Sequence, residues 1–233
     1  EDVAAFNRAI IEATAPFAAC YKPNIAFYEQ WGLPGLHALE QTLAAIPHDI
    51  PVIGDVKRGD MGNTAQAYAR AMFEHWNFDA ITLNGYLGLE SIEPYLAYEG
   101  RGFYLLCRTS NPGARDLQYL TVEGDRPLFE HMATLQTAWS DRIGLVVGAT
   151  APAELRRVRE LVPSASILVP GVGAQGGSAA DAIAAAWTGP GSLAVSASRS
   201  ILYASEGPDF AQAAADAARA LRDEMAEAAA APA

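Results

Sequence analysis

The sequence predicts an α/β fold, namely a (β/α)8 barrel whose first strand is absent from the given chain. Short apolar runs alternate with segments of helical spacing along the whole length. The runs are apolar on both faces, which is typical of a parallel sheet covered by helices. Seven strand–helix units can be counted and the chain opens directly on a helix, so a closed barrel needs one more strand ahead of residue 1. The alternative is an open sheet.

Each element follows from its own pattern. The runs predicted as strands are Ala18–Lys22, Val52–Lys57, Ala80–Leu83, Phe103–Arg108, Gly144–Gly148, Ser166–Val169 and Leu193–Ala197. The clearest helix begins at Asn63-Thr64, a pair that can cap its N-terminus. Its apolar face is formed by Ala65, Tyr68, Ala69, Met72, Phe73 and Trp76.

No composition shift or linker divides the chain, so residues 1–226 are predicted to form one barrel domain. The last helix is expected to run from about Asp209 to Ala226, and residues 227–233 to form an Ala/Pro tail without structure. Residues 110–127 are the longest irregular stretch, and a loop of that length is usually a lid or a binding loop.

Composition and charge exclude several classes of protein. An apolar content of 51% in 233 residues excludes disorder, and no apolar run is long enough to span a membrane. The N-terminus has no pattern of a secretion signal. A net charge of -11 disfavours nucleic acid as a partner. The only cysteines, Cys20 and Cys107, lie in apolar runs, which predicts buried thiols in a reducing cytoplasm.

Lysine is rare in this chain. Of the 16 basic residues only Lys22 and Lys57 are lysines, and both lie where a predicted strand ends. A desolvated ammonium can lose its proton, whereas a guanidinium effectively cannot. The alternative is that the two lysines occur by chance. Their shared location at strand ends instead favours a role in chemistry.

The segment IGDVKRGDMGNT, residues 53–64, ends a predicted strand in charged residues. The two-residue period of a strand places Asp55 and Lys57 on the same side, and Asp60 follows just past the strand end. Active sites of parallel α/β folds lie at this end of the strands. An ion pair that ties the strand to its loop is the structural alternative.

A glycine-rich turn, VPGVGAQGGS at residues 169–178, joins a predicted strand to a helix start. It contains GxGxxG, but the next strand ends in SASRS with Arg199, not in the acidic residue that a dinucleotide site needs. The turn and the helix N-terminus therefore predict a cradle for a single phosphate. The alternative is that the glycines only allow the turn to pack tightly and bind no phosphate.

Together these motifs resemble orotidine 5′-phosphate decarboxylase. The chain is most similar to the bacterial subgroup with the DxKRGDxGxT, RTSNP and PGVGAQGG patterns, from about residue 18 to 204. The resemblance implies a homodimeric (β/α)8 TIM barrel that needs no cofactor and no metal. It implies decarboxylation of orotidine 5′-phosphate to uridine 5′-phosphate in pyrimidine biosynthesis by a carbon–carbon lyase.

The resemblance also implies a role for individual residues. A charged tetrad, with Lys57 as the proton donor to C6, would consist of Lys22, Asp55, Lys57 and Asp60. Asp60 and Thr64 would reach into the site of the neighbouring subunit. Ser110 would bind the pyrimidine and Pro170 would line its pocket. The residues implied at the phosphate end are Gln175, Gly176, Gly177, Ser198 and Arg199.

One departure from the family concerns the ribose. Nothing here matches the G-x-D of the family's first strand, so either the chain as given starts after it, or ribose binding and barrel closure are impaired. Two other functions stay open. One is a phospho-nucleotide-binding barrel without turnover. The other is a Mg-dependent sugar-phosphate enzyme of the same superfamily, which Lys22 disfavours because a cation repels Mg²⁺.

Overall fold

The computed structural model describes residues 2–122, 124–173 and 176–231. Its strands are β1 (Ile53–Arg58), β2 (Ala80–Leu83), β3 (Gly102–Arg108), β4 (Thr121–Val122), β5 (Arg126–Pro127), β6 (Ile143–Val147), β7 (Ile167–Pro170) and β8 (Leu193–Ser196). Its longer helices are α1 (Asp2–Thr14), α3 (Leu33–Ala45), α4 (Gly62–Arg70), α7 (Leu128–Thr137), α8 (Pro152–Leu161), α9 (Ala179–Ala186) and α11 (Phe210–Ala230). The short helical pieces are η1 (Ala15–Phe17), α2 (Ala26–Glu29), η2 (Ala71–His75), η3 (Gly85–Leu87), η4 (Leu89–Ser91), α5 (Glu93–Leu96), α6 (Ala114–Leu117) and α10 (Arg199–Leu202).

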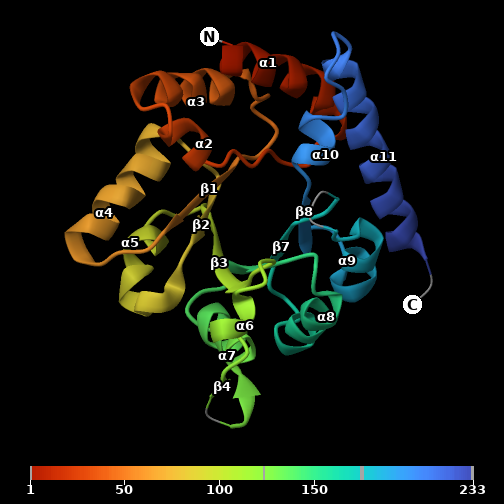
Figure 1. The fold of residues 1–233 in the computed structure, drawn as a ribbon. Helices are drawn as coiled ribbons and strands as arrows, with labels where there is room; N and C mark the ends of the chain where they lie inside the picture. The colour runs from red at the N-terminus through yellow and green to blue at the C-terminus, as the bar shows by residue number, and fades with distance from the viewer. Residues whose placement is uncertain (1, 123, 174–175, 232–233) are drawn as a thin grey trace.

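Six of the strands form one parallel sheet in the order β1-β2-β3-β6-β7-β8. The sheet is curled into half a barrel, with the strands at the centre and the helices around them (Figure 1). The strands β4 and β5 form a separate antiparallel hairpin. The predicted α/β barrel architecture is therefore confirmed, and six of the seven predicted strands lie within two residues of their expected bounds.

The prediction of a strand at Ala18–Lys22 was wrong. Residues 21–24 make only two isolated parallel bridges, Tyr21 with Val52, just before β1, and Asn24 with Asp55 in β1. The backbone N–H of Asp55 donates to the carbonyl of Pro23 at 2.9 Å, but Pro23 itself has no N–H to continue a ladder. Residues 21–24 nevertheless occupy the place of a strand beside β1.

The sheet ends at β8 on its other side. All four residues of β8 are only half-buried, whereas all five residues of β6 are buried. Within the described ranges no strand pairs beyond β8. The outer layer is continuous here, because α1 packs against α11 with the rings of Phe6 and Phe210 stacked at 5.1 Å.

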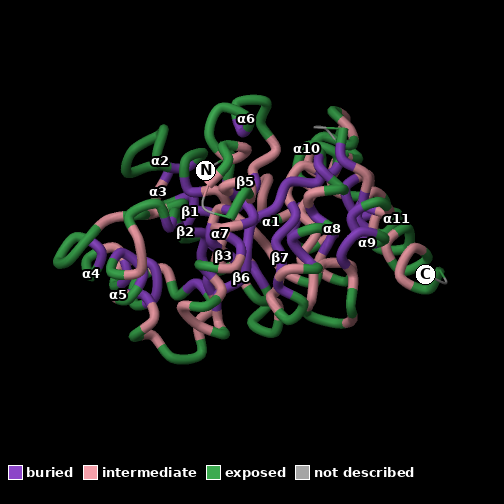
Figure 2. Tube along the Cα trace, turned by 90° about the horizontal axis from the view of Figure 1, so that it is seen from below, coloured by how far each residue is buried: buried purple, intermediate pink, exposed green. Residues whose placement is uncertain are grey.

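The apolar core lies mainly between the sheet and the helices. One cluster joins β1, β2 and β3 to α3, α4 and α5, and a second joins β3, β6 and β7 to α7, α8 and α9. Figure 2 shows the buried segments along the strands and the exposed ones in the outer loops. Inside the curl a smaller cluster consists of Ile53, Val146 and Leu168, with Tyr104 and Leu106 partly buried beside it. The inner face therefore remains more accessible than the outer one.

Three further expectations needed correction. The last helix continues to Ala230 rather than ending at Ala226, because alanine has the highest helix propensity. The stretch 110–127 contains α6 and the β4–β5 hairpin and is not a bare loop. The helix predicted to begin at Asn63-Thr64 is α4, and its N-cap residue is Met61. It was expected as one helix, but it changes at Ala71 into the π-helical turn η2.

Candidate active site

The residues predicted to act on a substrate come from the C-terminal ends of the parallel strands. Lys22 lies in the segment beside β1, and Asp55 and Lys57 lie in the last part of β1. Ser110 follows β3, and Pro170 is the last residue of β7. Because parallel strands end at one edge, the sheet gathers residues that are far apart in the sequence.

Asp55 is the centre of the charged group. Its side chain is only 9% exposed, and each of its carboxylate oxygens accepts a hydrogen bond from a lysine. The Nζ of Lys22 lies 2.7 Å from Oδ2, and the Nζ of Lys57 donates to Oδ1. The two lysines differ in access, because the side chain of Lys22 is 14% exposed and that of Lys57 is 48% exposed.

The charge state of Asp55 follows from these contacts. Burial by itself raises the pKa of the carboxyl group, but the charges and hydrogen bonds of Lys22 and Lys57 outweigh burial and hold the pKa below its usual value. Asp55 is therefore ionised at neutral pH, with both oxygens occupied by ammonium groups.

The backbone at Lys57 departs from a regular strand. Its φ is 45°, in the left-handed region that residues with a side chain rarely adopt. The pairing of β1 with β2 is irregular between Gly54 and Arg58. In this interval the N–H groups of Val56 and Lys57 both donate to the hydroxyl of Thr82 on β2, at 3.0 Å each. The same hydroxyl donates to Oδ1 of Asp55 at 3.1 Å.

Sequence reasoning did not identify Thr82. The sequence does contain a signal for it. Thr82 is the one polar residue in the apolar run AITL, which forms the strand next to the D-x-K strand. A buried hydroxyl needs partners, and the charged end of the neighbouring strand supplies them.

Asp60 does not join the other three charged residues. Its Oδ1 accepts the N–H of Met61 at 2.8 Å, and among the described residues no hydrogen bond or ion pair links it to Lys22, Asp55 or Lys57. Thr64 lies exposed in the first turn of α4. A single chain thus brings together three members of the predicted tetrad.

Ser110 lies where the ends of β3 and β6 meet. A Cβ atom on Gly148 would lie 2.7 Å from the Cβ of Ser110, so only glycine allows this approach. Thr150 donates its hydroxyl to the carbonyl of Ser110 at 3.3 Å. Pro170 lies beside this point, since its carbonyl accepts the N–H of Ala149 at 2.9 Å.

The glycine turn after β7 closes on itself. The N–H of Gly176 donates to the carbonyl of Gly173 at 2.8 Å, and the N–H of Gly177 donates to that of Gly171 at 3.2 Å. Gly171, Gly173 and Gly176 all have positive φ. A Cβ atom on Gly177 would come within 2.4 Å of the Cβ of Ala149. Gln175 lies outside the described residues.

Two N–H groups at the start of the helix that follows this turn already have partners within the chain. The N–H of Asp181 donates to the hydroxyl of Ser178 at 3.1 Å, and the N–H of Ala180 donates to the carboxylate of Glu224 at 3.3 Å. Ser198 and Arg199 are exposed at the start of α10, directly after β8. Ser200 lies close to the turn, since a Cβ on Gly173 would be 3.0 Å from its hydroxyl oxygen.

The segment after β3 is fastened to the body of the protein by Tyr119. Its hydroxyl accepts a hydrogen bond from the buried guanidinium of Arg108 at 2.9 Å and donates to the carboxylate of Glu154 on α8. The side chain of Gln118 adds a hydrogen bond to the hydroxyl of Thr109 at 2.8 Å. These contacts hold residues 109–119 over the strand ends.

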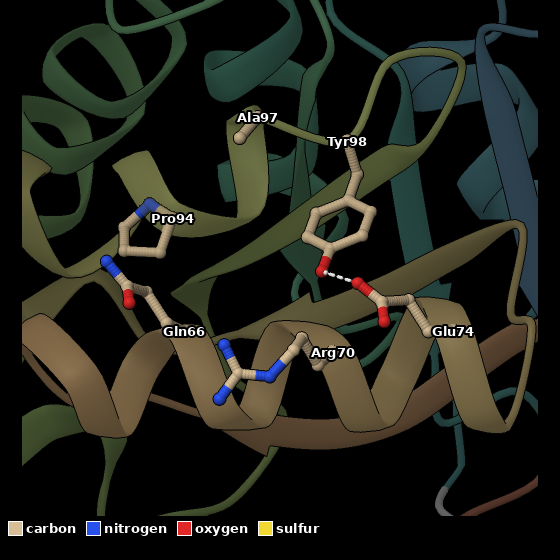
Figure 3. A pocket seen from close by; sticks show the side chains of 6 residues that line it. All are labelled: Gln66, Arg70, Glu74, Pro94, Ala97 and Tyr98. Carbon is tan, nitrogen blue, oxygen red and sulfur yellow. Dashed lines mark hydrogen bonds between the residues drawn. The ribbon is translucent and has the colours of Figure 1, made fainter.

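A separate groove of about 380 Å³ lies in the outer layer, away from the charged group. Figure 3 shows Gln66, Arg70 and Glu74 along one helical face opposite α5, with the hydroxyl of Tyr98 bonded to Glu74 at 2.6 Å. None of its lining residues belongs to the predicted site.

Comparison with known proteins identifies the family. The model of the orotidine 5′-phosphate decarboxylase / HUMPS family matches residues 2–216. The chain is 50% identical over 228 residues to the orotidine 5′-phosphate decarboxylase of Thermomicrobium roseum, covering 96% of this chain and 81% of that protein.

Solved structures agree. The orotidine 5′-phosphate (OMP) decarboxylase of Leishmania donovani superposes with a TM-score of 0.83 at 39% identity, covering 94% of this chain and 88% of that one. The UMP synthase of the same organism gives a TM-score of 0.85 at 40% identity, and the match spans half of that longer chain. From residue 2 to residue 216, therefore, this chain belongs to the orotidine 5′-phosphate decarboxylase / HUMPS family.

Proposed function

We propose that this protein is a carbon–carbon lyase that converts orotidine 5′-phosphate to uridine 5′-phosphate and CO2 in pyrimidine biosynthesis. The observation that carries the proposal is the buried carboxylate of Asp55 held between two ammonium groups, of which Lys57 is the more exposed. The relatives at 46 to 50% identity that bear the decarboxylase name support the same reaction.

The chemistry requires a fixed cation beside C6 of the pyrimidine. The bond between C6 and the carboxylate carbon breaks, CO2 leaves, and the electron pair stays on C6 in the plane of the ring. The ring π-system cannot delocalise this pair, so a nearby positive charge must stabilise it. Lys57 supplies that charge and then donates its proton to C6. Lys57 regains a proton from water after release of uridine 5′-phosphate.

Lys22 and Asp55 prepare this step. Both oxygens of Asp55 are bonded, so the carboxylate orients the Nζ of Lys57, and Lys22 balances its charge. Repulsion between the Asp55 carboxylate and the carboxylate of the substrate would be relieved when CO2 departs.

Substrate binding is assigned to the other strand ends. We assign Ser110 to the pyrimidine and Pro170 to the wall of its pocket. The phosphate would be held by Arg199 and Ser198, together with Gln175 from the turn. Gly176 and Gly177 would contribute to phosphate binding by shaping the turn, because their N–H groups donate to carbonyls of the turn itself. Binding energy from the remote phosphate would hold the reacting ring in place.

A homodimer with shared sites accounts for Asp60 and Thr64. Both lie on the connections that follow β1, and neither contacts the charged group of its own chain within the described residues. Large apolar side chains are exposed on the same connections and their neighbours, which is typical of an interface. They are Phe27, Trp31, Met61, Tyr86 and Leu87. A second copy covering them would bring Asp60 and Thr64 to the partner's site.

For the domain organisation and the location we keep the sequence prediction as our proposal. We assign residues 1–226 to a single barrel domain. Both cysteines are free, Cys107 buried and Cys20 only half-buried, so the predicted burial holds for Cys107 alone. Burial raises the pKa of the Cys107 thiol to about 12. Free thiols support our assignment to a reducing cytoplasm. No helix among the described residues is long and apolar enough to cross a membrane.

The decisive experiment is turnover of orotidine 5′-phosphate by the purified protein in EDTA, followed by loss of the orotate absorbance. We expect conversion that EDTA does not change, because ammonium groups already occupy both oxygens of Asp55. Conversion that EDTA abolishes and Mg²⁺ restores would contradict the metal-free mechanism. Binding of uridine 5′-phosphate without any turnover would indicate a non-catalytic barrel.

A further inference from the structure

The irregular pairing of β1 and β2 leaves backbone groups of the charged segment without partners in the sheet. Gly54 pairs with Ile81 and Arg58 pairs with Leu83, so three residues of β1 face a single residue of β2. That residue is Thr82. Its hydroxyl accepts two N–H groups that the ladder does not pair, those of Val56 and Lys57.

The Thr82 hydroxyl makes three contacts with three consecutive residues. It accepts from two N–H groups at 3.0 Å and donates to Oδ1 of Asp55 at 3.1 Å. One O–H donor and two acceptor lone pairs are the full capacity of a hydroxyl. Thr82 is 1% exposed, so water cannot easily replace any of these bonds. The hydroxyl thus joins the bulged backbone to the carboxylate that orients Lys57.

We propose that Thr82 is a positioning residue for the reaction. Its hydroxyl holds the backbone of residues 56–57 in the bulge and fixes Asp55, so that the Nζ of Lys57 meets C6 of the substrate. This inference rests on the proposed function. Lys57 has a left-handed backbone, a strained conformation that persists only where the surroundings enforce it, and Thr82 supplies the bonds that do so.

The test compares three variants. Thr82→Val removes the hydroxyl and keeps the shape, Thr82→Ser keeps the hydroxyl, and Thr42→Val is the matched control. Thr42 is also buried, at 5% exposed, and its hydroxyl donates to the carbonyl of Ala38 at 2.7 Å on α3, away from the site.

We expect Thr82→Val to lower kcat about ten- to hundredfold, because a displacement of about 1 Å in a catalytic group has an effect of this size. KM should change less than about threefold, because Thr82 is not assigned to substrate binding. Thr82→Ser and Thr42→Val should retain kcat within about threefold. The inference is overturned if Thr82→Val keeps its kcat, if it changes KM alone, or if Thr82→Ser is as slow as Thr82→Val.

Amide hydrogen exchange tests the bonds without substrate and without dependence on a variant that folds poorly. In the wild-type protein the N–H groups of Val56 and Lys57 should be protected despite their missing ladder partners, and Thr82→Val should expose them. Rapid exchange of both in the wild type would overturn the inference. If the wild-type protein does not convert orotidine 5′-phosphate, the proposed function fails, and the exchange data alone decide whether Thr82 holds this backbone.

Discussion

Arg159 should contribute more to stability than any other charged side chain in the described part of the chain. It lies on α8 and is 7% exposed, and the guanidinium has no carboxylate partner among the described residues. Instead it donates to five backbone carbonyls, at distances between 2.7 and 3.2 Å. The acceptors are Ala186, Val162, Pro163, Ala165 and Ser192. These residues end α8 and α9 or precede β7 and β8, so one side chain ties four elements at the end of the sheet away from the site.

The size of the effect can be worked out from these bonds for Arg159→Met. Nη1 has two N–H groups for three carbonyls, so four N–H groups serve the five acceptors. Four hydrogen bonds from a charged donor contribute roughly 6 to 12 kcal/mol before costs. Burial of the guanidinium, which lowers its pKa, opposes this by several kcal/mol. In the variant the carbonyl of the buried Ala186 loses this partner. The carbonyls of Val162 and Ser192 keep the backbone N–H groups that they already accept. We therefore expect a loss of about 3 to 4 kcal/mol in the free energy of unfolding.

Equilibrium urea unfolding followed by circular dichroism measures this loss, and Tm should fall by roughly 6 to 15 °C. Arg156→Met is the matched control, because Arg156 is exposed on the same helix and its replacement should change stability by less than about 0.5 kcal/mol. Arg159→Lys should lie between the two, since an ammonium has three donors rather than a planar fork. A loss below about 1 kcal/mol in Arg159→Met, or an equal loss in the control, would refute the reasoning.

Four further predictions concern the site. Lys57→Arg keeps the charge but not the transferable proton, so turnover should fall at least about a hundredfold while uridine 5′-phosphate still binds; near-normal turnover would contradict the role of Lys57. Arg199→Ala should raise KM for orotidine 5′-phosphate and leave the slow reaction of orotidine, which lacks the phosphate, unchanged. Because the pKa of Asp55 is lowered in the folded state, its charge stabilises the fold fully above the unfolded pKa of about 3.9. The difference in unfolding free energy between wild type and Asp55→Asn should therefore shrink as the pH falls through the folded pKa. A difference that grows at low pH would show that folding does not lower the pKa of Asp55. Mixing inactive Lys57→Ala with inactive Asp60→Ala should restore about one quarter of wild-type activity, because half of the dimers mix and each holds one intact site; no recovery after subunit exchange would argue against a shared site.

The strands could be predicted from the sequence because they are apolar on both faces and bounded by glycine, proline or charge. Six of them were found within two residues. The exception, Ala18–Lys22, has the composition of a strand but makes a single bridge, Tyr21 with Val52. Whether a short segment forms a regular ladder depends on the neighbour's register, and a local pattern does not contain that information.

The charged group was accessible to sequence reasoning for a different reason. Lys22 and Asp55 are 33 residues apart, yet they lie on β1 and on the parallel segment beside it, and topology alone brings such neighbours together. Hydrogen bonds of loops are less predictable. The N-terminus of α9 is bonded to Ser178 and to Glu224, 44 residues from Ala180, and nothing in the glycine motif indicates that second partner.

The positions of Thr82 and Arg159 suggest a physical division of the barrel. The end that carries the site contains features that cost stability: a buried carboxylate, a largely buried ammonium and a left-handed residue at Lys57, which by itself costs roughly 1 to 2 kcal/mol. Such features persist only where other contacts over-determine them. Thr82 provides these contacts locally, and Arg159 fixes the opposite ends of β7 and β8, the strands whose C-terminal ends lead to the glycine turn and to Arg199. Changes at Arg159 should therefore lower stability with little effect on kcat, whereas changes at Thr82 should lower kcat. A variant of Arg159 that slowed the chemical step as much as it lowered the free energy of unfolding would show that the two ends are not independent.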